Sequence, residues 1–559
     1  MHRLLPRFAL AALIAAWLLP AAADAAGATR CLTPTLPRPS EPYEAIRARL
    51  EAQGRWVASG DPDRSPPPNP QVGDTWLWYI WDLGGFPVAN LKPCTVRGMG
   101  DHCYVVVDDD EWNVGIDQAD VDVIVENFEN SSPGNWPTQG IWDLNTGHFG
   151  APPNPLDGLD RVFLLYYRFD ISADGFFWVY DQFPDGSQPF ASNEADVVYM
   201  AVDNGQPAGT YMLAVAAHEF QHLIHYARDT NEDSWLDEGF GELAMWLFGN
   251  PDTISSFNTN PDNNLIDFAG NWADYIQTYL WSLYVYEQFG GQPFIWAVAH
   301  SSLNGMASYN AVLASQGFGI ATDTVFRNWA VANFLDDPSV PNGEFGYLGE
   351  TLPPFTPWRT VTTYPATGNG GVSAWAGEYM RCTGIGGVLR LEFNGQDIRN
   401  FRVAMIGLDD TLPTQVQFLT LNAAQDGSLD FTAAQGYDQV IVMVANVASA
   451  SGSYTYNLSV LATPAGEGVP AATALAGAQP NPFNPKTSVH FSSDREQRLR
   501  LEVLDLAGRR VCVLADETFP AGAHVRDWDG RDAAGRPQPA GLYFARLSGT
   551  DGQLGTSRG

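Results

Sequence analysis

The hydrophobic pattern of the chain changes its period twice. Between residues 75 and 202 it contains short apolar runs typical of strands, at 75–82, 103–107, 121–125, 161–169, 176–180 and 195–202. The segment 128–160 is rich in Asn, Pro and Gly and is predicted to be a loop. From about residue 210 the apolar residues recur at helical spacing, at 211–228, 235–248, 273–289, 293–312 and 325–334. A strand-rich segment therefore precedes a helix-rich one.

Beyond residue 365 the pattern returns to short strands separated by Gly, Asp and Asn, at 388–393, 401–406, 416–421, 439–444 and 454–461. This spacing predicts a β-sandwich over 365–463, followed by a small-residue linker at 464–479. A last β-rich domain is expected at 480–559. The predicted fold class is multidomain, with an α+β domain at 101–345 followed by two all-β sandwich domains.

The N-terminus has the pattern of a secretory signal peptide at 1–26. A short basic region precedes an apolar stretch at 8–19, and small residues with A-x-A spacing follow. The alternative is an uncleaved anchor helix. Residues 27–100 begin Pro-rich and are interpreted as an N-terminal linker or pro-segment with some strands. No transmembrane span is expected after signal cleavage, and the mature protein is expected outside the cytoplasm.

Composition narrows the classes of partner. The 559 residues carry 64 Asp and Glu against 30 Lys and Arg, a formal net charge of -34. Nucleic acid is excluded as a partner because phosphate binding needs clustered basic residues, and anionic membrane surfaces are disfavoured for the same reason. Acidity is also compatible with Ca²⁺ binding, and a dense group of carboxylates is either a Ca²⁺ site or a solvated loop. That group consists of Asp108, Asp109, Asp110, Asp117, Asp120 and Asp122.

The five cysteines show no spacing typical of a zinc ribbon or a redox pair. Cys94 and Cys103 flank a turn that contains Gly and could form a disulfide, which export would permit. Cys512 lies in an apolar run and is interpreted as a buried thiol. The odd number of cysteines leaves at least one without an intramolecular partner.

The most informative motif is His218-Glu219-Phe220-Gln221-His222. Two His four positions apart on a helix lie on the same face, so both imidazoles can reach one metal ion. Tetrahedral Zn²⁺ needs a third protein ligand and an open position if it is catalytic. Glu219 lies beside the metal-facing stripe, where it can act as a general base. The alternative is a pair of surface His on an ordinary helix.

A third ligand follows sixteen residues later. Glu238 lies in the next predicted helix, which would bring it back to the metal if the two helices are antiparallel. Glu242 is one turn further on the same face and either orients a ligand His or is a solvated carboxylate.

HEFQHLIHY followed by EDSWLDEGFGELA resembles the gluzincin zinc metallopeptidases, and in particular the hyicolysin-type neutral metalloproteases. The resemblance implies a zincin-like peptidase domain at 101–345 in which His218, His222 and Glu238 bind one catalytic Zn²⁺ and Glu219 is the base. Asp237 stands where many relatives have Asn. Relatives often supply a Tyr or His that stabilises the oxyanion, and Tyr275 is the candidate, with Tyr279 second. His225 is a further His near the motif, outside the expected ligand set.

The strand at 195–202 is expected to be the sheet edge that holds an extended peptide substrate. Aminopeptidases of this clan carry a G-x-M-x-N element, which residues 201–204 resemble only weakly because the Gly and the Met are absent. An endopeptidase is therefore favoured over an aminopeptidase.

The last domain carries motifs of its own, including PNPFNP at 480–485, LEVLDLAGRR at 501–510 and AGLYF at 540–544. These resemble the FlgD-like immunoglobulin module and related sorting domains of type IX secretion. The resemblance implies contact with bacterial secretion machinery or the cell surface. The apolar final strand of such domains is absent at 554–559.

The predicted function is that of a secreted, zinc-dependent metalloendopeptidase acting on proteins or peptides, at the surface of a bacterium or outside it. The alternative is a secreted or surface binding protein whose peptidase-like domain is inactive. A hydrolase of non-peptide bonds is a third reading, which only the general chemistry of zinc supports.

Overall fold

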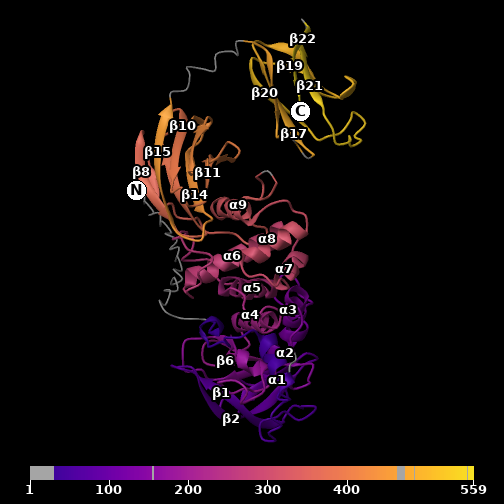
Figure 1. Cartoon of the computed structure of the whole chain (residues 1–559), viewed down its shortest axis with the longest axis vertical. Coiled ribbons are helices and arrows are strands. Elements are labelled where there is room, and N and C mark those ends of the chain that lie inside the picture. The colour runs from indigo at the N-terminus through magenta and orange to yellow at the C-terminus, as the bar shows by residue number, and fades with distance from the viewer. Residues whose placement is uncertain are drawn as a thin grey trace, which may run out of the picture. The chain divides into compact units, whose positions relative to one another are not determined.

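The computed structural model describes residues 31–153, 156–340, 342–461, 472–481, 483, 485–549 and 552–558. The expected signal peptide at 1–26 lies outside these ranges. The chain divides into two compact units. The first contains the residues up to 384 with 390–431 and 436–459, and the second contains 385–389, 432–435 and the residues from 460 onward. The structure is thus multidomain, with an α/β N-terminal region and several β-sheet regions (Figure 1).

The α/β region is built around a six-stranded mixed sheet in the order β1-β2-β3-β4-β6-β5. Its strands are β1 (Thr75–Asp82), β2 (Val88–Met99), β3 (Cys103–Asp108), β4 (Val162–Tyr167), β5 (Gly175–Phe177) and β6 (Val197–Ala201). β3, β4 and β6 run parallel and are buried along their whole length, as parallel strands covered on both faces are. The sheet begins before the boundary expected at residue 100, since β1 and β2 pair with each other and β2 pairs with β3.

Two expected elements in this region are wrong. The run 121–125, expected to be a strand, lies inside helix α2 (Gln118–Glu129). Asp117 and Asp120 form a capping box there, and Val121, Ile124 and Phe128 are buried at helical spacing. The cap and this spacing outweigh the strand preference of the β-branched side chains. The expected loop at 128–160 contains helix α3 (Ile141–Phe149).

Three successive helices form the centre of the first unit. Helix α4 (Thr210–Tyr226) packs on β5 and β6 and, on its other side, on α5 (Ser234–Phe248), which in turn packs on α6 (Trp272–Gln288) (Figure 1). Shorter helices follow as α7 (Gln292–Ala299), α8 (Met306–Ser315) and α9 (Thr322–Leu335). Nearly every residue of α4 and α5 is buried, which is typical of helices enclosed in a core. The site residues on these helices are therefore held in the interior.

The chain before the sheet is also ordered against this region. A short 3-10 helix, η1 (Thr33–Thr35), precedes helix α1 (Tyr43–Ala52). Tyr43, Ile46 and Leu50 of α1 are buried in the same hydrophobic core as the sheet and the helices.

Residues from 359 to 461 form two facing sheets. One has the order β13-β10-β15-β8 and the other β12-β11-β14-β9-β7. The strands are β7 (Arg359–Val361), β8 (Ala366–Val372), β9 (Ala376–Thr383), β10 (Val388–Gly395), β11 (Phe401–Leu408), β12 (Gln415–Leu419), β13 (Asp426–Phe431), β14 (Gln439–Asn446) and β15 (Gly452–Leu461). The second sheet packs on α9, and the Tyr379 hydroxyl donates to the Ala330 carbonyl at 2.6 Å. The sandwich and the helices therefore share one core.

The second unit contains a three-stranded sheet, β16-β17-β20, and a four-stranded sheet, β19-β18-β21-β22. Its strands are β16 (Ala474–Gln479), β17 (Thr487–Ser493), β18 (Gln497–Leu504), β19 (Arg510–Phe519), β20 (Gly522–Trp528), β21 (Phe544–Gly549) and β22 (Gly552–Arg558). The chain does form a final strand, because β22 pairs antiparallel with β21. This strand is not apolar, since Leu554 is the one large apolar residue between 552 and 558.

Two further findings concern the whole chain. Among the described residues, no helix combines the length and apolar character needed to cross a membrane. All five cysteines are free and buried. The disulfide that the sequence would allow between Cys94 and Cys103 is not formed, because the register of the hairpin places Cys94 opposite Asp108 rather than near Cys103.

Candidate metal centre

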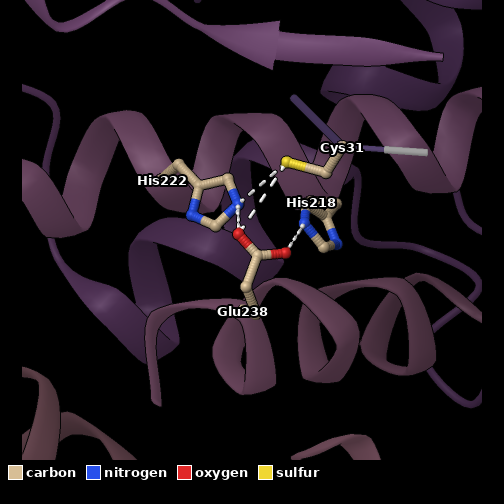
Figure 2. Close-up of side chains that lie close together, drawn as sticks. All are labelled: Cys31, His218, His222 and Glu238. Carbon is tan, nitrogen blue, oxygen red and sulfur yellow. Dashed lines mark hydrogen bonds and ion pairs between the residues drawn. The ribbon is translucent and has the colours of Figure 1, made fainter. Parts of the chain in front are cut away.

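Helix α4 presents His218 and His222 one turn apart, and α5 presents Glu238 between them (Figure 2). Glu238 Oε2 lies 3.3 Å from His218 Nε2, and its Oε1 lies 3.2 Å from His222 Nε2. All three residues are at most 3% exposed. The structure thus brings together the three residues that the sequence predicts as metal ligands.

A fourth group completes this cluster. Cys31, from the chain before η1, places its Sγ 3.5 Å from His222 Nε2 and 3.9 Å from Glu238 Oε1 (Figure 2). One ligand atom from each of Cys31, His218, His222 and Glu238 lies within 4.8 Å of the others. Nothing in the sequence analysis connected Cys31 with the motif.

The spacing of these atoms fits a tetrahedral metal ion. Bonds of about 2.1 Å to nitrogen and oxygen and about 2.3 Å to sulfur put tetrahedral ligand atoms about 3.4–3.6 Å apart. The contacts of 3.2, 3.3 and 3.5 Å are close to that spacing, and the Cys31 Sγ–Glu238 Oε1 contact is wider at 3.9 Å. His218 Nε2 and Glu238 Oε2 are buried and make no hydrogen bond. Because buried polar atoms normally have partners, these atoms are suited to hold a metal ion.

Two carboxylates behind the imidazoles orient them. Glu242 Oε1 lies 3.4 Å from His218 Nδ1, and Asp237 Oδ2 lies 3.2 Å from His222 Nδ1. Asp237 also pairs with His225 Nδ1 at 2.8 Å. A carboxylate on the far ring nitrogen fixes the tautomer and leaves Nε2 free for the metal. His225 therefore reaches the site only through Asp237.

Glu219 lies on the metal side of α4 but outside the ligand set. It is fully buried, its Oε1 has no hydrogen-bond partner, and its Oε2 accepts from the Thr33 hydroxyl at 3.0 Å. Burial raises the pKa of Glu219, whereas the charges of His222 and His218 hold the pKa of Glu238 below its usual value despite burial. The pKa values of the two carboxyls are therefore shifted in opposite directions.

The edge strand next to the site is β5, not the expected strand at 195–202. β6, which covers most of that run, lies between β4 and β5 and so has no free edge. The chain at residue 31 forms a parallel bridge with Gly175 of β5, and Leu32 N donates to the Gly175 carbonyl at 3.2 Å. A Cβ at position 175 would lie 2.8 Å from Glu219 Cγ, so glycine allows β5 to approach α4 this closely.

The two candidate tyrosines differ in position. The Tyr275 hydroxyl donates to the Cys31 carbonyl at 3.3 Å and faces the cavity lined by Cys31, His218 and Glu219. The Tyr279 hydroxyl donates to Glu350 at 2.7 Å instead. Tyr275 is therefore the tyrosine of the pair that can reach a group bound at this site.

The acidic cluster at 108–122 does not form a second centre. Its carboxylates interact with neighbouring groups instead. Asp109 forms an ion pair with Arg97 at 2.8 Å and Asp110 one with Lys92, while Asp117 and Asp120 form the capping box of α2. Within the described ranges, the residues that gather as metal ligands are those around Glu238.

Comparison with known proteins assigns no family. No protein-family model matches the sequence, and no curated protein matches it. Solved structures similar to parts of the chain include a beta-1,2-glucanase from Parabacteroides distasonis, at 10% identity and TM-score 0.13 over 34% of this chain and 32% of that one. A beta-glucuronidase from Parabacteroides merdae matches at 13% identity and TM-score 0.12, over 36% and 28%. The chain spans about a third of the length of these proteins, and scores this low show no common fold.

Sequence reasoning missed three residues of the site: Cys31, Thr33 and Asp237. Asp237 is adjacent to Glu238 and was visible only as a departure from the motif. The one signal for Cys31 was the odd number of cysteines, which leaves at least one thiol without an intramolecular partner.

Proposed function

We propose that this protein is a secreted, zinc-dependent metallopeptidase with a zincin-like domain, acting as an endopeptidase on proteins or peptides. The observation that carries the proposal is the convergence of His218, His222 and Glu238 with a separate buried carboxyl, Glu219, beside them. A ligand set alone would serve structure, whereas a ligand set with an unligated base serves hydrolysis.

Zinc held by these three residues would lower the pKa of a water molecule toward 7 and polarise a substrate carbonyl. The protein's own contribution is to position groups around that chemistry. The Thr33 hydroxyl, 3.0 Å from Glu219 Oε2, marks a place where an attacking water can donate to this carboxylate. Since burial raises the pKa of Glu219, the carboxyl can accept that proton and return it to the leaving amine.

Tyr275 supplies a donor for the developing oxyanion. Its hydroxyl already donates to a peptide carbonyl next to the metal group, that of Cys31, at 3.3 Å. A substrate carbonyl in the same place would receive this hydrogen bond, which strengthens as negative charge develops on the oxygen.

Endopeptidase action is supported by the sheet edge and by the lack of a free carboxylate for a substrate amine at residues 201–204. Asp203 accepts from the Phe169 and Asp170 amides at 3.1 and 3.0 Å, and Asn204 donates to the Ile171 carbonyl at 2.6 Å. These side chains hold the adjoining loop. An extended peptide lying along β5 can continue past the metal in both directions.

Secretion from a bacterium is proposed from the signal-like residues 1–26, and association with secretion machinery or the cell surface from the FlgD-like motifs of the last domain. The net charge of -34 gives no support to a nucleic-acid partner.

The test compares two proteins that both carry Cys31→Ser, the parent with Glu219 intact and a variant with Glu219→Gln. Without the Cys31 thiol beside the metal site, a difference in peptide cleavage between the two reports on Glu219 alone. Zinc content, circular dichroism and cleavage of a mixed peptide library are measured, with Glu126→Gln on the exposed face of α2 as the matched control. We expect internal cleavage by the parent and control and a loss of at least about 100-fold in Glu219→Gln, with zinc retained.

The alternative is a secreted binding protein with an inactive peptidase-like domain, which is favoured by the presence of Cys31 among the four residues that could hold a metal ion. Zinc binding without cleavage in both the parent and the control would establish that alternative. Trimming from the N-terminus alone would assign an aminopeptidase.

A further inference from the structure

The N-terminal segment 31–38 occupies the position that a substrate needs. Cys31 lies at the metal group, Thr33 at the base, and Arg38 Nη2 lies 3.5 Å from Asp237 Oδ2, behind His222. One short segment therefore contacts a ligand, the base and an orienting carboxylate. These three contacts are made by side chains that the mechanism does not use.

Backbone contacts hold the segment in the same place. Cys31 and Leu32 lie along the edge of β5, the Cys31 carbonyl accepts from Tyr275, and the Phe177 amide donates to Thr33 Oγ1 at 2.8 Å. The segment thus uses the free sheet edge and the oxyanion donor that we assign to substrate.

Little room is left at the site. The cavity lined by Cys31, Glu219 and Tyr275 has a volume of only about 10 Å³ that a water-sized molecule could enter. Pockets that bind small ligands have volumes of about 300–1,000 Å³. A peptide cannot reach the metal group while Cys31 and Thr33 remain in position.

A four-ligand group can also be a permanent structural metal site, because structural zinc is closed by four protein ligands. Glu219 argues against that reading. A structural site has no use for a fully buried carboxyl that faces the ligands with one oxygen lacking a hydrogen bond. Leaving such a group unpaired costs stability, which a catalytic role would explain.

We propose that Cys31 is the fourth ligand of the metal and that segment 31–38 keeps the enzyme latent until it leaves. This inference rests on the proposed peptidase function. Binding replaces the thiol S–H bond by a metal–sulfur bond and releases one proton; departure returns the proton to the thiolate and opens the fourth position.

The chain offers a point of release. Residues 40–42, between η1 and α1, are exposed, while Tyr43 of α1 is buried against Phe183 and Tyr226. Cleavage at 40–42 would free the short segment that carries Cys31 and leave α1 packed on the enzyme.

The experiment uses the zinc-loaded protein with residue 31 present, beside Cys31→Ser and the control Cys512→Ser in the second unit. X-ray absorption at the zinc edge reports the ligands directly. We expect a sulfur scatterer at about 2.3 Å in the wild type and the control, and only nitrogen and oxygen at about 2.0–2.2 Å in Cys31→Ser. Peptide hydrolysis should rise by at least about tenfold in Cys31→Ser alone, since the thiolate is the stronger competitor for the fourth position.

The outcomes separate the two proposals. Absence of sulfur in the wild type would overturn the ligand assignment whatever the activity. If Cys31→Ser loses both its zinc and its folded circular dichroism, the site is structural and latency is wrong. Equal peptide hydrolysis by the wild type and Cys31→Ser would overturn latency and leave the peptidase function standing. If Cys31→Ser keeps zinc without sulfur and cleaves nothing, the latency proposal and the peptidase function are both wrong, while the ligand assignment stands.

Thr33→Val provides a second variant that keeps the thiol. Valine matches the shape of threonine but cannot donate to Glu219, so the segment should be held less firmly while the zinc–sulfur distance is unchanged. We expect basal hydrolysis to rise severalfold and Cys31 to react faster with iodoacetamide, as followed by mass spectrometry of the peptide. Unchanged alkylation and activity would show that Thr33 contributes nothing to latency.

Discussion

The close approach of α5 to His218 depends on a glycine, Gly241. A Cβ at Gly241 would lie 2.7–2.8 Å from three atoms of the His218 imidazole. Glu238 and Glu242, on the same helix, both contact that imidazole. Glycine at 241 therefore lets α5 approach α4 closely enough for Glu238 Oε2 to lie 3.3 Å from His218 Nε2, as the proposed metal site requires.

Gly241→Ala should displace His218 and weaken zinc binding by about 10–100-fold, the range typical of lost orienting contacts. The measurement is competition with a chelator of known affinity. Gly147→Ala is the matched control, since a Cβ there has nothing within 4 Å. Equal zinc affinity in the two variants would contradict this role for Gly241.

Asp237 acts on the second ligand His through charge. It lies 3.2 Å from His222 Nδ1 and 2.8 Å from His225 Nδ1. Asp237→Asn keeps the size of the side chain but removes its charge, so zinc affinity should fall by about tenfold. Asp143→Asn on the exposed face of α3 should leave the affinity unchanged in the same chelator competition.

At the scale of elements, α6 places Tyr275 at the site and begins with a defined cap. The Asn271 side chain accepts from the Asp274 amide, and Asp274 accepts from the Asn271 amide, both at 3.2 Å. Asp274 also accepts from Asn263 at 2.8 Å. These bonds fix the first turn of α6, and Tyr275 is the next residue after Asp274.

Asn271→Ala should lower the free energy of unfolding by about 1 kcal/mol, because it leaves an amide of the first turn without a partner. Urea denaturation followed by tryptophan fluorescence measures this. Asn127→Ala, at a half-buried position inside α2, makes the same Asn-to-Ala exchange away from a helix cap, and we expect it to leave the free energy of unfolding unchanged or to raise it slightly. A loss of the same size in both variants would exclude a specific effect of the cap.

At the scale of the whole molecule, the first sandwich is a structural continuation of the helical region. Its sheet packs on α9, and residues of both lie in one hydrophobic cluster. Arg402 pairs with Asp323 of α9, and the Arg327 guanidinium lies 3.6 Å from the Phe418 ring centre. Unfolding of the sandwich should therefore destabilise the helices that carry the metal ligands.

Glu378 makes the stability of this sandwich depend on pH. It lies on β9, faces Tyr454 of the opposite sheet and accepts a hydrogen bond from the tyrosine hydroxyl. Burial raises the pKa of Glu378 from 4.5 to about 7. Because the folded-state pKa is raised, the contribution of Glu378 is fully present below the unfolded pKa and is lost as pH rises through about 7.

Between pH 5 and pH 8 the wild type should lose on the order of 2–3 kcal/mol that Glu378→Gln does not lose, since the amide cannot ionise. Urea denaturation at both pH values measures the difference. Glu392→Gln, on the exposed side of β10, should behave like the wild type. A pH dependence of the same size in all three proteins would contradict the assignment to Glu378.

The sequence by itself determined what depends on near neighbours. The helix that carries His218, Glu219 and His222 follows from a long unbroken apolar pattern, and the shared face of the two His follows from the helical repeat. The strands of the sandwich follow from alternation and turn residues. Where local signals competed, as at 121–125, a capping box and burial at helical spacing decided for helix.

Only the tertiary structure decided which distant residues meet. Cys31 and His222 are 191 positions apart, and no local pattern states that the chain returns to the metal group along β5. The same holds for the edge of the sheet, because strand order depends on pairing between segments rather than on the composition of one strand. The sequence predicted His218, His222 and Glu238 from their spacing on two successive helices. The position of the segment that carries Cys31 over these residues depends on the packing of the whole first unit.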